Sequence, residues 1–501
     1  MIKEVRKKHA ARHLTAALTA VLVLSACSAK DLDVIYDLSQ QDQKDEYYNL
    51  IGGDDDGNGS LVLLGPMFEP IPKTDDQADT EKTEKKEKDD GKKKKQEEKE
   101  EKTEDAVKDP EKEKDEVKTS DVSKPSEPME LETDQRSRED IEREDQEKRS
   151  AIGLTEERIQ GIMAENNGRY YYDHLDGDNK RLYAELYHIT VARGEKIKVS
   201  SMDEKTVDTV FQYMMADHPE IFYADGYTYT RYTIGDELIK LGFTARYLCD
   251  TAEEKARNEA IEGKVAAILA GAPGGEDQYA KAKYVYEKLI DMTEYEIGSP
   301  DNQNICSVFI NGRSVCQGYA KAAQLLLNRM GVKTTLVTGT VSAGSRPQAR
   351  HAWNLTNVNG RDYFLDVTWG DSSFQQAASE ETLNRRINYD YLLDTTRDIA
   401  GTHSCDALVP IPECTHLEDN YYVREGAYFT AYSAEQMAAL FERAYSSGAE
   451  TVTVKCADDT AYGEITGVLI TDRGIFDYLK TSGNTASFAT SDTQRTLTFV
   501  L

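Results

Sequence analysis

Asn359 and Gly360 constrain the fold of this 501-residue chain more than any other short feature. They separate two segments rich in β-branched and aromatic residues, His351–Val358 and Arg361–Trp369. Asn-Gly between two such segments is the strongest short signal for a type I′ turn in a β-hairpin. That turn fixes the register, so the numbers of paired residues should sum to 358 + 361 = 719. The sequence therefore predicts an antiparallel hairpin of known register.

This register predicts which side chains share a face of the hairpin. Trp353 should face Asp366, and His351 should face Thr368. Because side chains alternate along a strand, His351 and Asp366 should be diagonal neighbours on one face. We therefore expect an imidazole–carboxylate contact between them.

A cysteine precedes a predicted helix earlier in the chain. Cys316 starts a segment in which apolar residues recur at helical spacing and which ends at Arg329, with Gly331 as the C-cap. The unpaired N–H groups at a helix N-terminus favour negative charge. They should therefore favour the thiolate of Cys316 and leave donors free to bind an oxyanion.

These three residues fit a thiol acyl-transfer site. Cys316 would be the nucleophile, His351 its base and later the acid, and Asp366 the group that orients the imidazole. Attack on an amide would give a thioester, which water hydrolyses or an amine accepts. The alternative is a small buried cysteine with two incidental polar residues. The helix, the hairpin register and the order along the chain agree in favouring the site.

Three segments together resemble the transglutaminase-like domain of bacterial surface proteins, a papain-related fold. They are Val315–Gly331, His351–Trp369 and Tyr389–His403. The resemblance implies an α+β core in which a helix bearing the cysteine packs on an antiparallel sheet bearing the histidine and aspartate, flanked by small α/β modules.

The same resemblance implies roles for individual residues. It assigns the triad to Cys316, His351 and Asp366, and makes Trp353 and Trp369 packing residues of the two strands. The family often continues the aspartate strand with a second acidic pair, whereas this chain has Gly370 there. That difference leaves the following loop open and does not affect the triad.

A side-chain oxyanion donor is expected upstream of the nucleophile. The candidates are Asn302, Gln303, Asn304 and Asn311. We favour Gln303 by resemblance to amide-bearing positions in related folds, while an amide that only caps a loop is equally compatible.

Residues 1–27 have the features of a secretory signal. Basic residues precede an apolar run from Leu14 to Leu24, which is too short to span a membrane. The ending Leu24-Ser25-Ala26-Cys27 resembles a bacterial lipobox, which implies that Cys27 is lipid-modified. We therefore expect a protein anchored by lipid on the extracytoplasmic face of the membrane. The alternative is an ordinary cleaved signal with an unused cysteine.

Residues 28–150 are predicted to be a disordered charged linker. Residues 30–72 have no sustained apolar period, and residues 73–149 are dominated by Lys, Glu and Asp and can bury little apolar surface, so they should be disordered or transiently helical. The net charge of −30 argues against nucleic acid as a partner. A calcium-like loop beginning at Asp54 has Gly65 where a bidentate Glu is required, so we predict no metal or cofactor.

The remaining chain divides into an N-terminal α/β subdomain (151–250), the transglutaminase-like domain (251–400) and a small C-terminal α/β module (401–501). The first should contain a tyrosine-rich strand, Ile221–Tyr232, whose side chains more often pack a sheet than line a groove. The last should contain a helix capped by Ser433 and another from Thr471 to Thr481.

Four residues after the predicted core form an H-x-C…C-x-H pattern: His403, Cys405, Cys414 and His416. Outside the cytoplasm a Cys405–Cys414 disulfide is the first interpretation. Unpaired thiols come second, and zinc comes last because the spacing matches no strong zinc signature.

Two classes of function follow. The first is a peptidase, amidase or transglutaminase acting on peptide, protein or peptidoglycan-peptide amides, working as a monomer. The second is a catalytically silent surface module that uses the same cleft for binding. A deeply buried Cys316, or one separated from His351, would favour the silent module.

Overall fold

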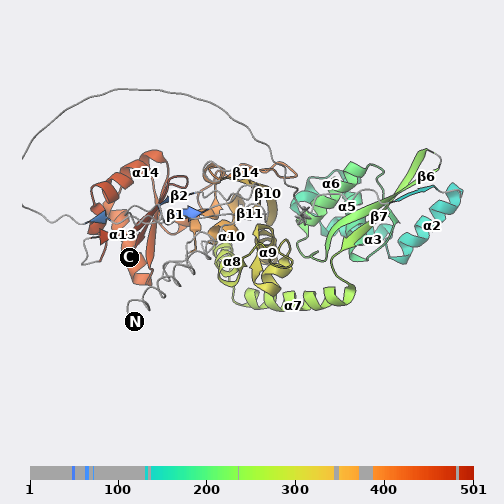
Figure 1. Cartoon of the computed structure of the whole chain (residues 1–501), viewed down its shortest axis with the longest axis horizontal. Coiled ribbons are helices and arrows are strands. Elements are labelled where there is room, and N and C mark those ends of the chain that lie inside the picture. Colours follow the sequence, from blue (N-terminus) through green and yellow to red (C-terminus); the bar gives the residue numbers. More distant parts are fainter. Residues whose placement is uncertain are drawn as a thin grey trace, which may run out of the picture.

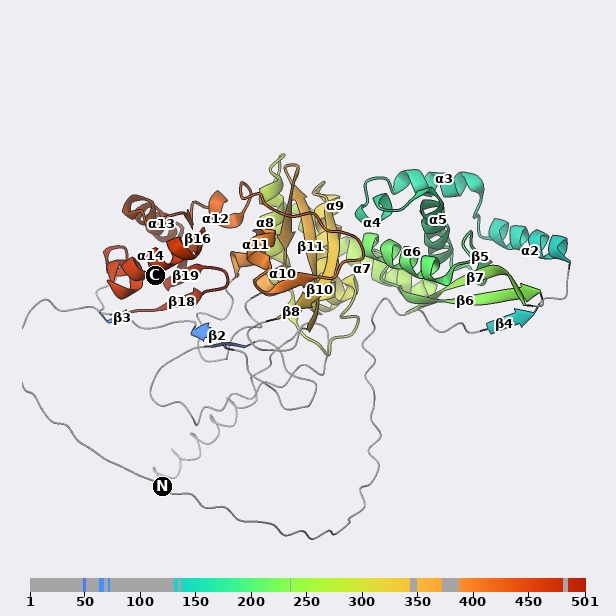
Figure 2. The same ribbon diagram turned by 90° about the horizontal axis from the view of Figure 1, so that it is seen from above.

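The computed structural model describes residues 48–50, 63–66, 71–72, 130–133, 137–234, 236–342, 349–371, 387–480 and 485–501. The predicted signal segment, the lipidation site Cys27 and most of the predicted linker lie outside these residues. Three groups of elements follow one another along the longest axis of the molecule, in chain order (Figures 1 and 2). Among the residues described, no helix has both the length and the apolar composition that a membrane span requires.

The N-terminal group combines helices with a four-stranded sheet. Its helices are α2 (Arg138–Ala151), α3 (Glu156–Glu165), α4 (Tyr170–Asp173), α5 (Gly177–Val191) and α6 (Glu204–Asp217). Its sheet has the order β4-β6-β7-β5, with β4 (Glu130–Thr133), β5 (Ile197–Lys198), β6 (Ala224–Ile234) and β7 (Glu237–Tyr247). Tyr227 of β6 stacks on Phe243 of β7 at 5.2 Å between ring centroids, so this tyrosine packs within the sheet as predicted.

Helix α2 corrects the predicted extent of the linker. All but its last residue, Ala151, fall in the range 28–150; it begins after the N-cap Ser137 and buries Ile141 and Asp145. The Asp145 carboxylate forms a buried ion pair with Lys240 of β7. A helix held by one buried apolar residue and a buried charge pair has no clear apolar stripe, so the composition of this segment concealed it.

The central group is built on a five-stranded antiparallel sheet with the order β13-β12-β11-β10-β14. Its strands are β10 (Thr334–Val341), β11 (Ala349–Val358), β12 (Arg361–Leu365), β13 (Leu392–Asp394) and β14 (His403–Cys405). Helix α9 (Cys316–Arg329) packs against β10 and β11, with α8 (Gln278–Met292) beside it and α7 (Thr251–Ala270) preceding both. This arrangement confirms the predicted core, in which the cysteine helix packs on an antiparallel sheet.

The hairpin has the predicted register up to Leu365. Asn354 pairs with Leu365 and Val358 with Arg361, so both pairs sum to 719. Asn359 and Gly360 have φ angles of 54° and 81°, as a type I′ turn requires.

The second strand is shorter than predicted. Strand β12 ends at Leu365, and Asp366 becomes the N-cap of a short helix, α10 (Val367–Gly370), by accepting a hydrogen bond from the Trp369 N–H at 3.1 Å. The prediction that Thr368 faces His351 and that Trp369 belongs to the strand is therefore wrong. Asp is a strong N-cap residue, and here its local capping ends the ladder.

The C-terminal group has its own sheet, with the order β15-β16-β19-β18. The strands are β15 (Tyr428–Phe429), β16 (Thr451–Cys456), β18 (Phe488–Ser491) and β19 (Thr496–Val500), and helix α13 (Ala434–Ser447) starts at Ser433 as predicted. The helix predicted from Thr471 is wrong: α14 (Asp459–Thr466) continues as a π-helix, η5 (Gly467–Thr471), and a 3₁₀-helix, η6 (Gly474–Asp477), follows.

Apolar contacts connect the groups to different extents. One hydrophobic cluster extends from Leu154 to Leu393, and thus joins the N-terminal and central groups. A separate cluster fills the C-terminal group. The division of the chain at 250 and at 400 stays a prediction.

Candidate active site

Cys316 is the first residue of α9, as the sequence predicted. The N-cap Val315 has no side-chain hydrogen bond to the helix, and the first turn contains no acidic residue. The positive end of the helix dipole is therefore not neutralised by a side chain, and it favours a thiolate at this position.

Asn354 fixes the helix relative to the sheet. This residue of β11 donates from its side-chain amide to the Ala320 carbonyl of α9 at 3.0 Å and to the Thr335 carbonyl of β10 at 3.2 Å. Because Asn354 is fully buried, these contacts are shielded from competing water. They hold the start of α9 close to His351, which lies on the same strand.

His351 and Asp366 form the contact that the hairpin register predicted. The imidazole Nε2 lies 2.6 Å from Asp366 Oδ2. Burial lowers the pKa of His351, but the Asp366 carboxylate and Cys316 raise it by more. The net effect raises the pKa of His351 to about 10. Burial raises the pKa of Asp366, but His351 and His403 together hold it well below its usual range. The pair is therefore an imidazolium and a carboxylate at neutral pH.

The contact with Asp366 determines which nitrogen remains for the cysteine. Nε2 is occupied by Asp366, and Nδ1 is buried without a protein hydrogen bond of ordinary geometry. Cys316 is nevertheless close enough to raise the pKa of His351 by charge and by hydrogen bonding. Nδ1 is thus the nitrogen that can exchange a proton with the thiol, in the order cysteine, histidine, aspartate.

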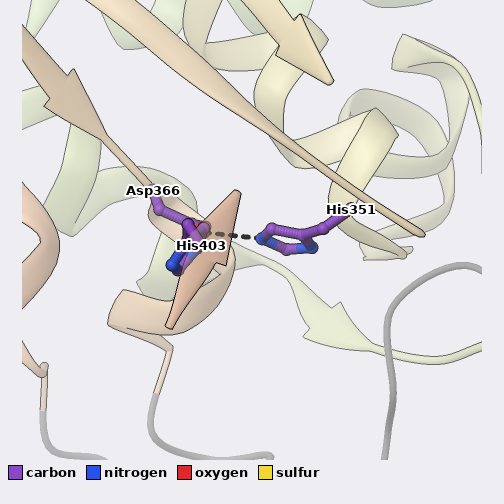
Figure 3. A group of neighbouring side chains, drawn as sticks. All are labelled: His351, Asp366 and His403. Atoms are coloured by element: carbon purple, nitrogen blue, oxygen red, sulfur yellow. Dashed lines mark hydrogen bonds and ion pairs between the residues drawn. The ribbon is translucent and has the colours of Figure 1, made fainter. Parts of the chain in front are cut away.

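His403 joins this site, although the sequence did not assign it there. Its Nε2 lies 2.9 Å from the same Asp366 Oδ2, and Figure 3 shows both imidazoles meeting at this carboxylate. His403 reaches the site because β14 pairs with the edge of β10, with Val341 opposite His403. The third family-like segment ends at His403, but local spacing could not place it beside Asp366, because the pairing that brings it there is long-range.

The predicted disulfide is not formed. Cys405 is an exposed free thiol and Cys414 is a buried one. Zinc at the H-x-C…C-x-H pattern is also contradicted, because His403 is turned toward Asp366 and His416 lies near Glu418. The second interpretation, unpaired thiols, is the one that the structure supports.

Another group of residues has the donor types of a metal site. His351, Asp366 and His403 are the one such group in the part of the chain that the structure describes, with ligand atoms within 4.8 Å of one another. Both imidazole Nε2 atoms already lie at hydrogen-bonding distance from Asp366 Oδ2. A metal ion would have to separate these contacts, so we interpret the group as a hydrogen-bonded set.

The amide candidates for the oxyanion are mostly occupied by loop contacts. Asn302 donates to the Ile297 carbonyl, Asn304 accepts from the Cys306 N–H at 2.9 Å, and Asn311 donates to the Pro300 carbonyl at 3.0 Å. Gln303 is half-buried and, within the described residues, its amide has no such partner. Gln303 therefore remains a candidate, and so does Asn304, because its contact uses the amide oxygen and not the N–H donors.

Aromatic rings and the N-terminal group close the site. Trp353 lies 5.8 Å from the His351 ring, and Trp369 lies 4.8 Å from the His403 ring. Cys316 belongs to a hydrophobic cluster that includes Tyr171 of α4, whose hydroxyl donates to the Leu336 carbonyl at 2.6 Å. Cys316 is 0% exposed and His351 is 2% exposed.

Gly370 is the last residue of α10, the helix that Asp366 caps. The structure explains why this position requires glycine. A Cβ at this position would lie 1.9 Å from the Tyr286 hydroxyl oxygen and 2.2 Å from Tyr286 Cζ. That hydroxyl donates to the Asn388 carbonyl at 2.6 Å, so it cannot move without breaking this partly buried hydrogen bond.

We expect Gly370→Ala to reduce the free energy of unfolding by about 1–3 kcal/mol, as overpacking does in buried sites. Thermal and denaturant unfolding of the full chain would measure the loss. Gly463→Ala is the matched control, since nothing lies within 4 Å of its Cβ position in α14. It should be neutral or stabilise by up to about 1 kcal/mol. Equal stability of the two variants would contradict the steric explanation.

The chain resembles known proteins in this central region. Residues 267–365 match the family model of the transglutaminase-like superfamily. No curated protein matches the chain in sequence.

Solved structures with similarity include one described as a TGase, with 13% identity, a TM-score of 0.21 and coverage of 29% of this chain and 44% of that one. A candidate cysteine protease from Cytophaga hutchinsonii has 12% identity and a TM-score of 0.21, covering 36% of this chain and 70% of that one. A candidate protease from Parabacteroides distasonis has 9% identity and a TM-score of 0.18, covering 26% and 29%. The chain thus spans less than half of the TGase and of the Parabacteroides protein.

Proposed function

Since residues 267–365 form a transglutaminase-like domain, we propose that this protein is a thiol acyl-transfer enzyme that uses Cys316, His351 and Asp366. The observation that carries the proposal is the buried contact of 2.6 Å between His351 Nε2 and Asp366 Oδ2, which leaves Nδ1 for the nearby Cys316. An oriented imidazolium beside a thiol at a helix N-terminus is what a thiolate nucleophile requires.

The reaction follows from these roles. The Cys316 thiolate attacks the carbonyl carbon of an amide, and the carbonyl oxygen takes the negative charge. When this intermediate collapses, the C–N bond breaks and the His351 imidazolium gives its proton to the departing nitrogen, leaving a thioester. His351, now neutral, removes a proton from water or an amine as it attacks the thioester. The products are an acid or a new amide, and the thiolate–imidazolium pair is restored.

The substrate class and location belong to the same proposal. The lipobox-like ending at Cys27 supports anchoring to the membrane on its outer side. Peptide, protein or peptidoglycan-peptide amides are then the substrates within reach.

One observation favours a second candidate function. Cys316 is fully buried, and a substrate carbonyl cannot reach a thiol that is 0% exposed unless the surrounding side chains move. A catalytically silent module that binds peptide or cell-wall ligands next to a closed core is compatible with this burial.

Alkylation of the full chain at neutral pH distinguishes the two functions. The exposed free thiol of Cys405 serves as an internal reference, and peptide mapping follows each cysteine separately. If the protein is an enzyme, iodoacetamide should alkylate Cys316 faster than Cys405. His351→Ala should lower the alkylation rate of Cys316 and leave that of Cys405 unchanged. Cys316→Ala confirms the assignment of the labelled peptide. If Cys405 reacts and Cys316 does not, the silent module is the better description.

A further inference from the structure

His403 contacts the candidate site but has no role in the triad. Its imidazole lies between two buried polar groups: Nε2 is 2.9 Å from Asp366 Oδ2, and Nδ1 is 2.8 Å from the Thr402 hydroxyl. The backbone holds it there, because β14 pairs with β10 and the Ser342 N–H donates to the Thr402 carbonyl at 2.9 Å. A fully buried imidazole with both nitrogens paired is fixed in orientation.

The protonation state of His403 assigns its two hydrogen bonds. Burial lowers the pKa of His403 more than the Asp366 carboxylate raises it, so the ring is neutral at neutral pH. Asp366 is ionised and can only accept, so Nε2 must carry the proton and donate. Nδ1 is then left to accept, so the Thr402 hydroxyl donates its one proton to Nδ1 at 2.8 Å and not to the Ile399 carbonyl at 3.4 Å.

Three donors therefore converge on Asp366. The Trp369 N–H donates to Oδ1 at 3.1 Å, while His351 and His403 both donate to Oδ2. The three come from α10, β11 and β14. Together they fix the carboxylate plane, which determines the direction in which His351 presents Nδ1.

We propose that His403 is a positioning residue: its neutral imidazole holds the Asp366 carboxylate in the orientation that aligns His351 with Cys316. This role rests on the proposed function, because it acts through the triad. It differs from a packing role, since it depends on one N–H donor and on the tautomer that Thr402 selects.

Other titratable groups face this cluster without competing for the role. Tyr391 lies 5.7 Å from the His403 ring, and Tyr286 of α8 lies close enough to Asp366 to be affected by its charge. Burial raises the pKa of both hydroxyls well above 10, so both are neutral. On the other side of the Asp366 carboxylate lies His351, which Cys316 approaches in turn.

The first test reads the tautomer and does not depend on activity. The full chain is labelled with ¹⁵N in its histidine rings, and long-range ¹H–¹⁵N spectra are recorded from pH 5.5 to 8.5. The signals that disappear in His403→Gln belong to His403. We expect an unprotonated Nδ1 and a protonated Nε2 throughout this range. A proton on Nδ1, or titration of the ring within this range, would overturn the proposal.

The second test measures the pH profile of Cys316 alkylation. In His403→Leu, Asp366 loses one donor and its fixed orientation, so the acid limb should move up by about one pH unit, which is about tenfold slower labelling on that limb. His403→Gln keeps an N–H donor at similar reach and should recover most of the rate. The control His416→Gln changes an exposed histidine and should match wild type.

The outcomes separate this inference from the proposed function. If Cys316 in the wild-type protein is alkylated no faster than Cys405, the proposed function fails. The tautomer spectra still show which ring nitrogen of His403 carries the proton. The positioning role is wrong if Cys316 is alkylated rapidly in the wild-type protein but His403→Leu leaves the acid limb of its pH profile unchanged. It is also wrong if His403→Gln lowers the alkylation rate as much as His403→Leu does. A lower melting temperature without a shifted limb means that His403 only packs.

Discussion

Asp366→Asn is expected to slow alkylation of Cys316 at neutral pH by roughly ten- to a thousand-fold, because an opposite charge at contact distance shifts a pKa by about 1–3 units. The carboxylate is what keeps a buried His351 protonated: without it, burial would lower the pKa of His351 with only Cys316 opposing. The thiolate would lose its cationic neighbour. Site-resolved rates from peptide mapping measure this effect.

The same change predicts a pH dependence of stability. His351 has a raised pKa, so its contribution to stability is complete below its unfolded value of about 6.5 and is lost as pH rises through about 10. Asp366 has a lowered pKa, so its contribution is present above about pH 3.9 and is lost on acidification. Wild type should therefore exceed Asp366→Asn in melting temperature most between about pH 4 and 6.5, and least above about pH 10.

Asp362→Asn is the matched control for this prediction. Asp362 lies on the same strand, β12, and accepts a hydrogen bond from Asn357 Nδ2 at 2.7 Å, a contact that an amide oxygen can also make. In Asp362→Asn, the alkylation rate of Cys316 and the pH dependence of the melting temperature should equal those of the wild-type protein. An Asp366→Asn protein that alkylates as fast as the control would show that Asp366 does not activate the site.

Asp145→Ala is expected to lower the free energy of unfolding by about 3–5 kcal/mol, the usual cost of leaving one member of a buried ion pair without its partner. Asp145 and Lys240 have side chains that are each 3% exposed, and their contact joins α2 to β7. Lys240 would keep only the face of Tyr232, 4.3 Å from its Nζ. Denaturant unfolding of the full chain, monitored on the N-terminal group, measures the change.

A second ion pair joins the same two elements and provides the control. Arg138 of α2 and Glu237 of β7 are 2.6 Å apart, but their side chains are 66% and 64% exposed. Glu237→Ala should therefore cost less than about 1 kcal/mol. The double variant Asp145→Leu/Lys240→Met should recover much of the lost stability, because it leaves no buried charge. If Asp145→Ala costs no more than Glu237→Ala, burial is not what gives this pair its strength.

Local features of the sequence determined several parts of this structure. The turn at Asn359 and Gly360 requires two positive φ angles, which few residue pairs adopt, so the hairpin register and the His351–Asp366 contact followed from it. Helix α9 starts at Cys316 and α13 follows the Ser433 cap, both as predicted. Caps and periodicity depend on residues within a few positions of one another, which is why they can be read in a single chain.

Contacts between distant segments decided the rest. His403 reaches Asp366 only because β14 adds to the edge of β10, and α2 is held by a charge pair across 95 positions of sequence. Cys316 is buried in a hydrophobic cluster that also contains Tyr171, which belongs to another group of elements. Strand pairing and burial depend on which segments meet in space. The tertiary structure alone therefore decided that the residues of the proposed triad lie in a closed core and that a second imidazole contacts Asp366.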